Sequence, residues 1–330
     1  MNRIVVLVLV TLLAAGCSHE TQVTLSGRTM GTTYSVKIIE PDVDSAALKE
    51  EIDAELVRIN DLMSTYIVDS ELNRFNRSPV GEWMPVSKDL LVVVRLARQI
   101  HDLSGGAFDP TVGPLVNLWG FGPTPADRTV PSDEQINEAM TRVGFDLLEI
   151  GDTALKRNAD VYVDLSAIAK GYGVDQVAHI LDRHGYRNYL VEIGGEVFAK
   201  GRNARELPWR IAIERPDTTQ RVPFKTLDVS GKGVATSGDY RNYFEVDGKR
   251  YSHTIDPATG RPITHNLASV TVIAENTALA DALATTIDVL GPEKGMALAV
   301  QQKLPVFAII KSADGFIERH SPEFEVYLDD

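Results

Sequence analysis

The sequence predicts a mixed α+β fold in one large domain, with interleaved helices and mostly antiparallel strands. Of its 330 residues, 44% are hydrophobic and 24% are charged, a balance typical of globular proteins. Helical and β-type segments follow one another without the regular strand–helix–strand repeat of a parallel sheet. Glycine and proline are scattered, so no linker divides the chain. We expect one domain over residues 23–330.

The first 16 residues have the pattern of a secretory signal peptide. A basic start is followed by the apolar run Ile4–Leu13, which is too short to span a bilayer, and by three small residues. Cys17, the single cysteine, excludes an internal disulfide. The stretch Leu12–Cys17 resembles a bacterial lipobox, which implies acylation of Cys17 and a lipidated tether over 17–22.

We therefore expect a lipid-anchored protein on the periplasmic side of a bacterial cell envelope. The inner membrane is favoured over the outer one. Ser18 leaves this choice open, because Asp is the residue after the cysteine that favours retention in the inner membrane.

In the first half of the chain, β-branched residues over Val23–Glu40 predict a β-hairpin. Apolar residues at helical spacing predict helices over about 45–63 and Ser87–Leu103. A third helix is expected to begin at Ser132, because Gln135 lies at capping-box spacing from it.

In the second half, a short strand over Val161–Asp164 is expected to lead into a helix from Ser166 to His184. Asn276 is expected to cap a helix that runs to Leu290 and ends at Gly291. Further strands are expected over Tyr189–Ile193, Trp209–Glu214, Tyr243–Val246, Leu267–Ala274, Leu304–Ile310 and Phe316–Glu318.

The net charge of −13 gives the chain no overall electrostatic reason to bind nucleic acid. An acidic protein that binds a phosphate must compensate locally, with a cation or with backbone N–H groups. Asp281 and Thr285 lie one helical turn apart, opposite an expected core stripe of Leu279, Leu283 and Ile287. A carboxylate and a hydroxyl suit Mg²⁺. The alternative is a solvated polar face.

Two other segments carry candidate groups. Asp164 ends the expected strand and Lys170 follows in the next helix, where Lys170 could bind a phosphate or pair with Asp164. The alternative is a helix cap and a surface lysine. Tyr172 could stack on a flavin or pack in the core. His253 lies at an expected strand end and is a candidate general base, or a structural histidine.

Gly194-Gly195-Glu196 could approach a ligand closely or form only a tight turn. No dinucleotide-binding or P-loop glycine pattern is present, no zinc-binding cluster is found, and no nucleophile-elbow motif accompanies His253.

Taken together, these segments resemble the ApbE family of FAD:protein FMN transferases. The matches run in order from residue 27 to 291. They are Gly27–Thr32, Leu62–Tyr66, Gly105–Gly122, the Asp164 segment, Thr236–Gly238 with Tyr240–Tyr243, Ser252–His253 with Ile255–Pro257, and Ala280–Thr285.

The resemblance implies roles for individual residues. Mg²⁺ would be held by Asp281, Thr285 and the backbone carbonyl of Ala167. Some members carry a second Asp where Ala284 stands here, so a second protein-held metal is not expected. The implied FAD contacts are Met30, Ser64, Thr65, Tyr66, Ala107, Phe108, Asp109, Asp164, Lys170 and Ile255.

The resemblance also implies the reaction: FAD is cleaved, FMN is attached to a Thr or Ser of an acceptor protein, and AMP leaves. The acceptor would be an exported or membrane redox subunit with an Asp-x-x-Ser/Thr-Gly-Ala-Ser/Thr motif. We take His253 as the base that accepts the hydroxyl proton. Two alternatives stay open, an FAD pyrophosphatase that releases FMN and AMP, and a flavin-binding lipoprotein without turnover.

Overall fold

The computed structural model describes residues 22–123, 128–216, 222–238 and 242–328. The expected signal peptide, Cys17 and the matched residues Tyr240 and Arg241 lie outside these ranges. The first strand begins at Gln22, the last residue of the expected tether. Among the described residues, no helix is both long and apolar enough to cross a membrane.

The fold is built on an eight-stranded sheet with the order β1-β2-β6-β7-β10-β15-β16-β17, and every neighbouring pair is antiparallel. Its strands are β1 (Gln22–Thr29), β2 (Thr32–Ile39), β6 (Tyr189–Ile193), β7 (Glu196–Lys200), β10 (Lys232–Gly238), β15 (Leu267–Ala274), β16 (Val306–Ser312) and β17 (Gly315–His320). This largely antiparallel sheet with interleaved helices confirms the predicted α+β class.

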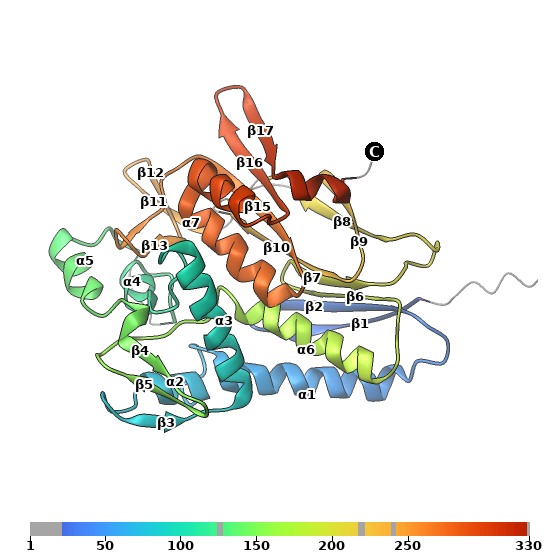
Figure 1. The fold of residues 1–330 in the computed structure, drawn as a ribbon, viewed down its shortest axis with the longest axis horizontal. Helices are drawn as coiled ribbons and strands as arrows, with labels where there is room; N and C mark the ends of the chain where they lie inside the picture. The colour runs from blue at the N-terminus through green and yellow to red at the C-terminus, as the bar shows by residue number, and fades with distance from the viewer. Residues whose placement is uncertain (1–21, 124–127, 217–221, 239–241, 329–330) are drawn as a thin grey trace, which may run out of the picture.

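Helices cover one face of this sheet (Figure 1). They are α1 (Ser45–Met63), α3 (Lys88–Ser104), α6 (Ala169–Arg183) and α7 (Thr277–Gln301). Successive strand residues point to opposite faces. On β15, Val272 packs in the cluster that includes α3 and α7, while Ile273 packs on the other face. That second face is covered by the hairpin of β8 (Trp209–Glu214) and β9 (Pro223–Val229).

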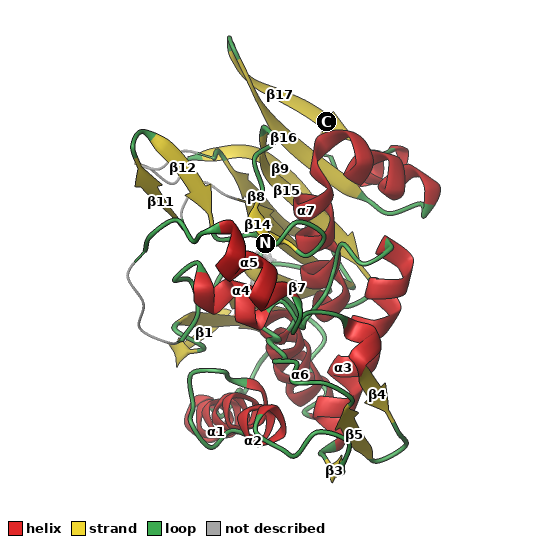
Figure 2. Cartoon of the chain, turned by 90° about the vertical axis from the view of Figure 1, so that its left-hand side faces the viewer, coloured by secondary structure: helices red, strands yellow, loops and turns green. Residues whose placement is uncertain are grey.

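Smaller elements gather beside the helical layer. A three-stranded sheet has the order β3-β5-β4. An aromatic cluster that includes Trp119, Phe244 and Tyr251 joins α4 to the β11–β12 hairpin. These elements lie on the left-hand side of Figure 1, which faces the viewer in Figure 2. The bounds of these elements are α2 (Glu71–Asn76), β3 (Trp83–Pro85), α4 (Gly113–Leu118), α5 (Asp133–Met140), β4 (Leu148–Ile150), β5 (Ala154–Arg157), β11 (Tyr243–Val246), β12 (Lys249–Ser252), β13 (Ile255–Asp256), β14 (Arg261–Pro262) and two 3₁₀ helices, Phe145–Leu147 and Pro322–Tyr327.

The expected strand at Val161–Asp164 is wrong, as is the helix start at Ser166. The side chain of Asn76 donates to the carbonyl of Val163 at 2.9 Å and accepts its N–H at 2.8 Å, replacing a neighbouring strand. The Asp164 carboxylate accepts the N–H of Ser166 at 2.8 Å. The helix itself, α6, begins three residues later, at Ala169.

Helix α7 also differs from the prediction. Asn276 caps it as expected, and Gly291 breaks it with a φ of 77°. However, a second helical stretch follows from Pro292 to Gln301. The expected single core stripe is wrong, because the first stretch packs against α3, α6 and the sheet and is buried almost all round. Asp281 is only 4% exposed, so it is not part of a solvated face.

Candidate functional site

A cavity of about 530 Å³ lies where the helical layer meets the smaller elements. A second cavity of about 600 Å³ adjoins it and shares Met30, Tyr66, Ser166 and Lys170 with it. The predicted residues that line the first are Met30, Tyr66, Ala107, Phe108, Asp109, Asp164, Ala167, Lys170, His253, Ile255, Asp281 and Thr285. Ser64 and Thr65 line the second. The structure thus brings together every predicted site residue that it describes.

The centre of the site is the contact between α6 and α7. The backbone N–H of Gly171 donates to Oδ2 of Asp281 at 3.0 Å, which ties the first turn of α6 to the second turn of α7. The carboxylate of Asp175 caps α7 by accepting from Thr277 N at 2.7 Å and Ala278 N at 2.9 Å. These two contacts fix Asp281 beside the segment that carries Ala167 and Lys170.

Glycine at position 171 allows this close approach. A Cβ there would lie 2.4 Å from the carbonyl oxygen of Thr277 and 2.8 Å from Cα of Ala278. Both are backbone atoms of α7, which cannot move aside as a side-chain end can.

We expect Gly171→Ala to lower the free energy of unfolding by about 1–3 kcal/mol through overpacking. This loss should exceed the gain of about 1 kcal/mol that alanine brings to a helix interior. Urea unfolding measures the change. Gly173→Ala is the matched control, because its Cβ would meet the mobile end of Met30, so its loss should be smaller. Equal stability of Gly171→Ala and the wild type would contradict this account.

Two more charged groups face the same cavity. Lys170 forms an ion pair with Oε1 of Glu196, the first residue of β7. Burial lowers the pKa of Lys170, but the negative charges of Asp281 and Glu196 outweigh it and hold that pKa above its ordinary value. Burial raises the pKa of the Glu196 carboxyl, and the charge of Lys170 opposes this rise.

The predicted metal ligands satisfy a first test of chemistry. The Asp281 carboxylate is buried, and burial raises its pKa, which Lys170 and the Gly171 N–H oppose. A buried carboxylate of this kind gains from a cation. The Thr285 hydroxyl contacts the Ser237 hydroxyl at 3.3 Å and keeps lone-pair capacity. The described residues hold no group of three or more acidic, His or Cys side chains that could bind a metal ion.

Two aspartates lining the cavity also shape their own loops. Oδ1 of Asp109 accepts from the N–H and hydroxyl of Thr111 at 2.8 and 2.5 Å, and Oδ2 accepts from Phe145 N at 3.2 Å. Oδ1 of Asp164 accepts from Ser166 N and Oγ at 2.8 and 2.5 Å. Asp164 therefore closes the turn before α6 and does not cap that helix, whose N-cap residue is Ile168. The suggested pair of Asp164 with Lys170 is replaced by the pair of Lys170 with Glu196.

His253 follows the last residue of β12 and lines the cavity, at the strand end predicted. Its Nδ1 lies 3.1 Å from the carbonyl oxygen of Asn242. Since a carbonyl only accepts, Nδ1 carries the proton in this contact, and Nε2 of the neutral ring carries the lone pair. The edge of the ring packs near Phe121, with 6.3 Å between ring centroids.

The rim includes a strained turn and an exposed aromatic side chain. Met30 has a φ of 47° at the β1–β2 turn, a left-handed conformation that is uncommon for a non-glycine residue and recurs at functional sites. Tyr66 is 67% exposed although it lines both cavities. Thr65 lines the second cavity, and its buried hydroxyl has no hydrogen-bond partner among the described residues.

Tyr172, a candidate for stacking on a flavin, packs in the core instead. Its ring is 7% exposed, and its hydroxyl donates to Asp89 at 2.5 Å. The packing alternative is therefore the correct one.

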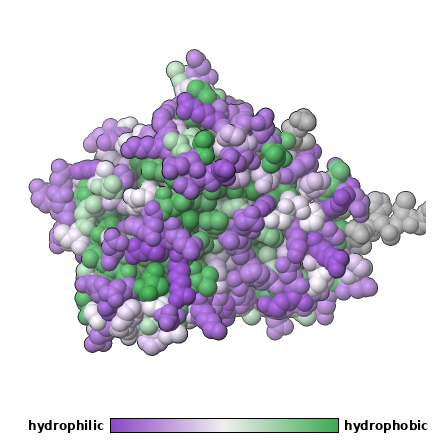
Figure 3. Space-filling model, viewed as in Figure 1, coloured by the Kyte–Doolittle hydropathy of each residue, from purple (hydrophilic) through white to green (hydrophobic). Residues whose placement is uncertain are grey.

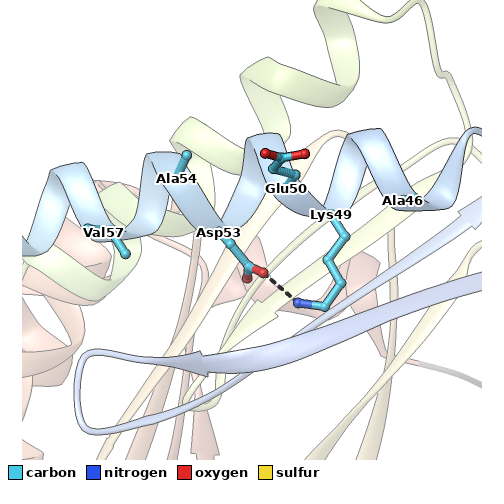
Figure 4. A pocket seen from close by; sticks show the side chains of 6 residues that line it. All are labelled: Ala46, Lys49, Glu50, Asp53, Ala54 and Val57. Carbon is cyan, nitrogen blue, oxygen red and sulfur yellow. Dashed lines mark hydrogen bonds and ion pairs between the residues drawn. The ribbon is translucent and has the colours of Figure 1, made fainter.

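Surface features elsewhere are less specific. A hollow beside α1 is lined by residues of that helix alone, and its Lys49 pairs with Asp53 at 2.6 Å (Figure 4). On the face shown in Figure 3, hydrophobic surface shows between hydrophilic areas around α3 and α7. Neither feature combines titratable groups from several elements as the main cavity does.

Sequence reasoning missed several residues of the cavity. Glu196 is the most important of these, and the Gly-Gly pair before it between two strands was the available signal. Ser237 and Asn242 belong to the polar segment that the family resemblance covers. The other cavity residues that were not predicted are Pro110, Val112, Val116, Phe121, Ser166, Thr236, Gly238, Thr254, Pro257 and Val289.

The fold and the cavity define a mixed α+β protein whose site gathers a lysine, a histidine and several acidic side chains from different elements. The family model described as the ApbE family matches residues 30–310, and the chain belongs to this family. The resemblance seen in the sequence is thereby confirmed.

Relatives of known activity cover nearly the whole chain. The FAD:protein FMN transferase of Vibrio cholerae is 51% identical over 321 residues, which are 96% of each chain. That of Escherichia coli is 43% identical over 320 residues, 94% of this chain and 91% of the relative.

Solved structures agree. The flavin transferase ApbE from Vibrio cholerae superposes with a TM-score of 0.88 at 48% identity, covering 93% of this chain and 99% of that one. The flavinyl transferase ApbE of Pseudomonas stutzeri gives a TM-score of 0.86 at 42% identity, covering 92% and 96%.

Proposed function

We propose that this chain is an FAD:protein FMN transferase that uses Mg²⁺ to cleave FAD and attaches FMN to a Thr or Ser hydroxyl of an acceptor protein. One observation carries the proposal. Asp281 and Thr285, one turn apart on α7, line the same cavity as Ala167, Lys170 and His253. The high identity to transferases over nearly the full chain supports the same activity.

The residues of the site divide into two groups. Asp281, Thr285 and the carbonyl of Ala167 would hold Mg²⁺, a set of oxygen ligands that this ion prefers. When bound, Mg²⁺ neutralises charge that develops on the pyrophosphate. Lys170 adds a positive charge in the same cavity, and Met30, Ser64–Tyr66, Ala107–Asp109, Asp164 and Ile255 would contact the rest of FAD.

In the reaction, the acceptor oxygen forms a bond to the phosphorus of the FMN half. The bond from this phosphorus to the bridging oxygen breaks, and AMP leaves with that oxygen. The proton of the acceptor hydroxyl moves to Nε2 of His253, whose Nδ1 is held at the Asn242 carbonyl.

The products of a single incubation test this function. The 18–330 fragment is incubated with FAD and Mg²⁺, with and without an acceptor domain, and the products are weighed. A transferase adds the mass of FMN less one water to the acceptor and releases AMP. Free FMN and AMP without acceptor would indicate a pyrophosphatase, and FAD that stays intact with acceptor present would indicate a binding protein.

The acceptor and the anchor complete the proposal. The acceptor would be an exported or membrane redox subunit with the Asp-x-x-Ser/Thr-Gly-Ala-Ser/Thr motif. Acylated Cys17 would anchor the chain on the periplasmic side, with the inner membrane favoured. Since β1 begins at Gln22, the tether reaches at most about 18 Å from the membrane surface. Full-length protein should sediment with membranes. The Cys17→Ala variant, which cannot be acylated at this position, should stay in the soluble fraction. Equal sedimentation would contradict the anchor.

A further inference from the structure

Glu196 is a buried acidic residue of the cavity that the proposed reaction does not yet use. It opens β7 directly after the Gly194–Gly195 turn, and it is 4% exposed. Both glycines of this turn have positive φ, at 62° and 106°. The tight connection sets the Glu196 side chain beside the first turn of α6, where Lys170 lies.

The hydrogen bonds of Glu196 do not fit a purely structural role. Oε1 accepts from the ammonium group of Lys170, whereas Oε2 is buried and has no hydrogen-bond partner among the described residues. Buried carboxylate oxygens that serve only the fold are normally satisfied. A half-satisfied carboxylate that lines a ligand cavity therefore points to a role in the site.

Charge in the cavity explains what that role is. Lys170 is one ammonium group that lines the same cavity as two buried carboxylates, Glu196 and Asp281. It forms an ion pair with Glu196, and no ion pair with Asp281 occurs between these described residues. Attraction between charges is strong in a buried site. Without the charge of Glu196, Lys170 would be drawn to Asp281 and would compete with a cation there.

We propose that Glu196 is a positioning residue that keeps Lys170 from pairing with Asp281, so that Lys170 serves the substrate pyrophosphate and Asp281 serves the metal. This inference rests on the proposed function, because it assumes Mg²⁺ at Asp281. In this role, Glu196 affects the metal only through its ion pair with Lys170.

Mg²⁺ titration followed by thermal unfolding tests this role without relying on turnover. In Glu196→Gln, we expect the Mg²⁺ concentration for half-maximal stabilisation to rise about tenfold, as when a supporting residue of a metal site is lost. In the double variant Lys170→Met/Glu196→Gln, the competing ammonium group is gone. The Mg²⁺ concentration for its half-maximal stabilisation should return to within about threefold of the wild type. Its KM for FAD should still be higher than that of the wild type, because Lys170 no longer contacts the pyrophosphate.

Two further variants make the test specific. Glu196→Asp keeps the charge and should stay within about threefold of the wild type. It also serves if Glu196→Gln folds poorly. Glu275→Gln removes the acidic partner of Lys232 in a surface pair of 2.6 Å and should change nothing.

The outcomes separate this inference from the function it rests on. If Mg²⁺ stabilises the wild type and the half-maximal concentration for Glu196→Gln lies within twofold of it, the role of Glu196 is overturned and the metal site is not. The same holds if the double variant loses as much as Glu196→Gln, because the loss would then be structural. A wild type that Mg²⁺ does not stabilise, with or without FAD, would overturn the proposed metal site together with this role.

Discussion

Replacing Asp281 with Asn is expected to lower the FMN transfer rate about a thousandfold, since metal stabilisation of transition-state charge supplies several kcal/mol. Asp281 is the only carboxylate among the three predicted metal ligands. Asn keeps the shape and can still accept the N–H of Gly171, which lies 3.0 Å from Oδ2. The rate is measured as the amount of acceptor that has gained the mass of FMN after a fixed time, over a range of Mg²⁺ concentrations.

The same variant should separate activity from folding. Burial raises the pKa of the Asp281 carboxyl, so the metal-free folded state holds its proton more tightly than the unfolded state does. The stability of the metal-free protein therefore falls as pH rises through this titration, and Asn removes this loss. We expect metal-free Asp281→Asn to unfold at the same temperature as the wild type at neutral pH, or at a higher one.

With Mg²⁺ present, only the wild type should gain stability, by about 2.7 kcal/mol at 100 times the dissociation constant. Asp61→Asn, an exposed change on α1, is the control. Wild-type turnover in Asp281→Asn, or undiminished wild-type turnover in excess EDTA, would contradict the metal assignment.

Replacing His253 with Ala should lower the transfer rate at least about a hundredfold, the lower end of the contribution of a general base. FAD binding should change little, because the proposed work of His253 is to take a proton from the acceptor. Added imidazole should restore part of the rate, since it can enter the space left by the ring. The measurement is the rate of acceptor labelling at saturating FAD, with and without imidazole.

His184→Ala is the matched control for this prediction. His184 is a surface histidine paired with Glu51 at 2.7 Å, outside both cavities, and its loss should leave the rate unchanged. Near-wild-type transfer by His253→Ala would remove His253 from the role of base.

Much of the fold was predictable because local signals were strong. The apolar stripe of α1, the capping box at Ser132 and the Asn276 cap all gave elements close to those observed. Local signals failed where distant contacts decide. Nothing within residues 161–164 reveals that the side chain of Asn76 will bind the backbone of Val163. Likewise, the helical wheel of α7 could not show that three neighbours bury it all round.

The site likewise combines residues that local patterns indicated with residues that only distant contacts bring in. Asp281, Thr285 and His253 each had an ordinary alternative, and only their joint order resembled a family. The structure then placed them at one cavity. Glu196 escaped prediction because its partner Lys170 is 26 residues away in sequence and its burial depends on packing of α6 against the sheet. Gly171 escaped for a similar reason, since its close contact with α7 spans the two helices.

The most direct test of the central claim is an anomalous diffraction measurement on crystals of the protein soaked with FAD and Mn²⁺, which replaces Mg²⁺ at oxygen ligands. The account predicts one strong Mn²⁺ peak between the Asp281 carboxylate, the Thr285 hydroxyl and the Ala167 carbonyl, in contact with the FAD pyrophosphate. Bound FAD with no Mn²⁺ peak at these three residues, or with its pyrophosphate away from Lys170, would contradict it.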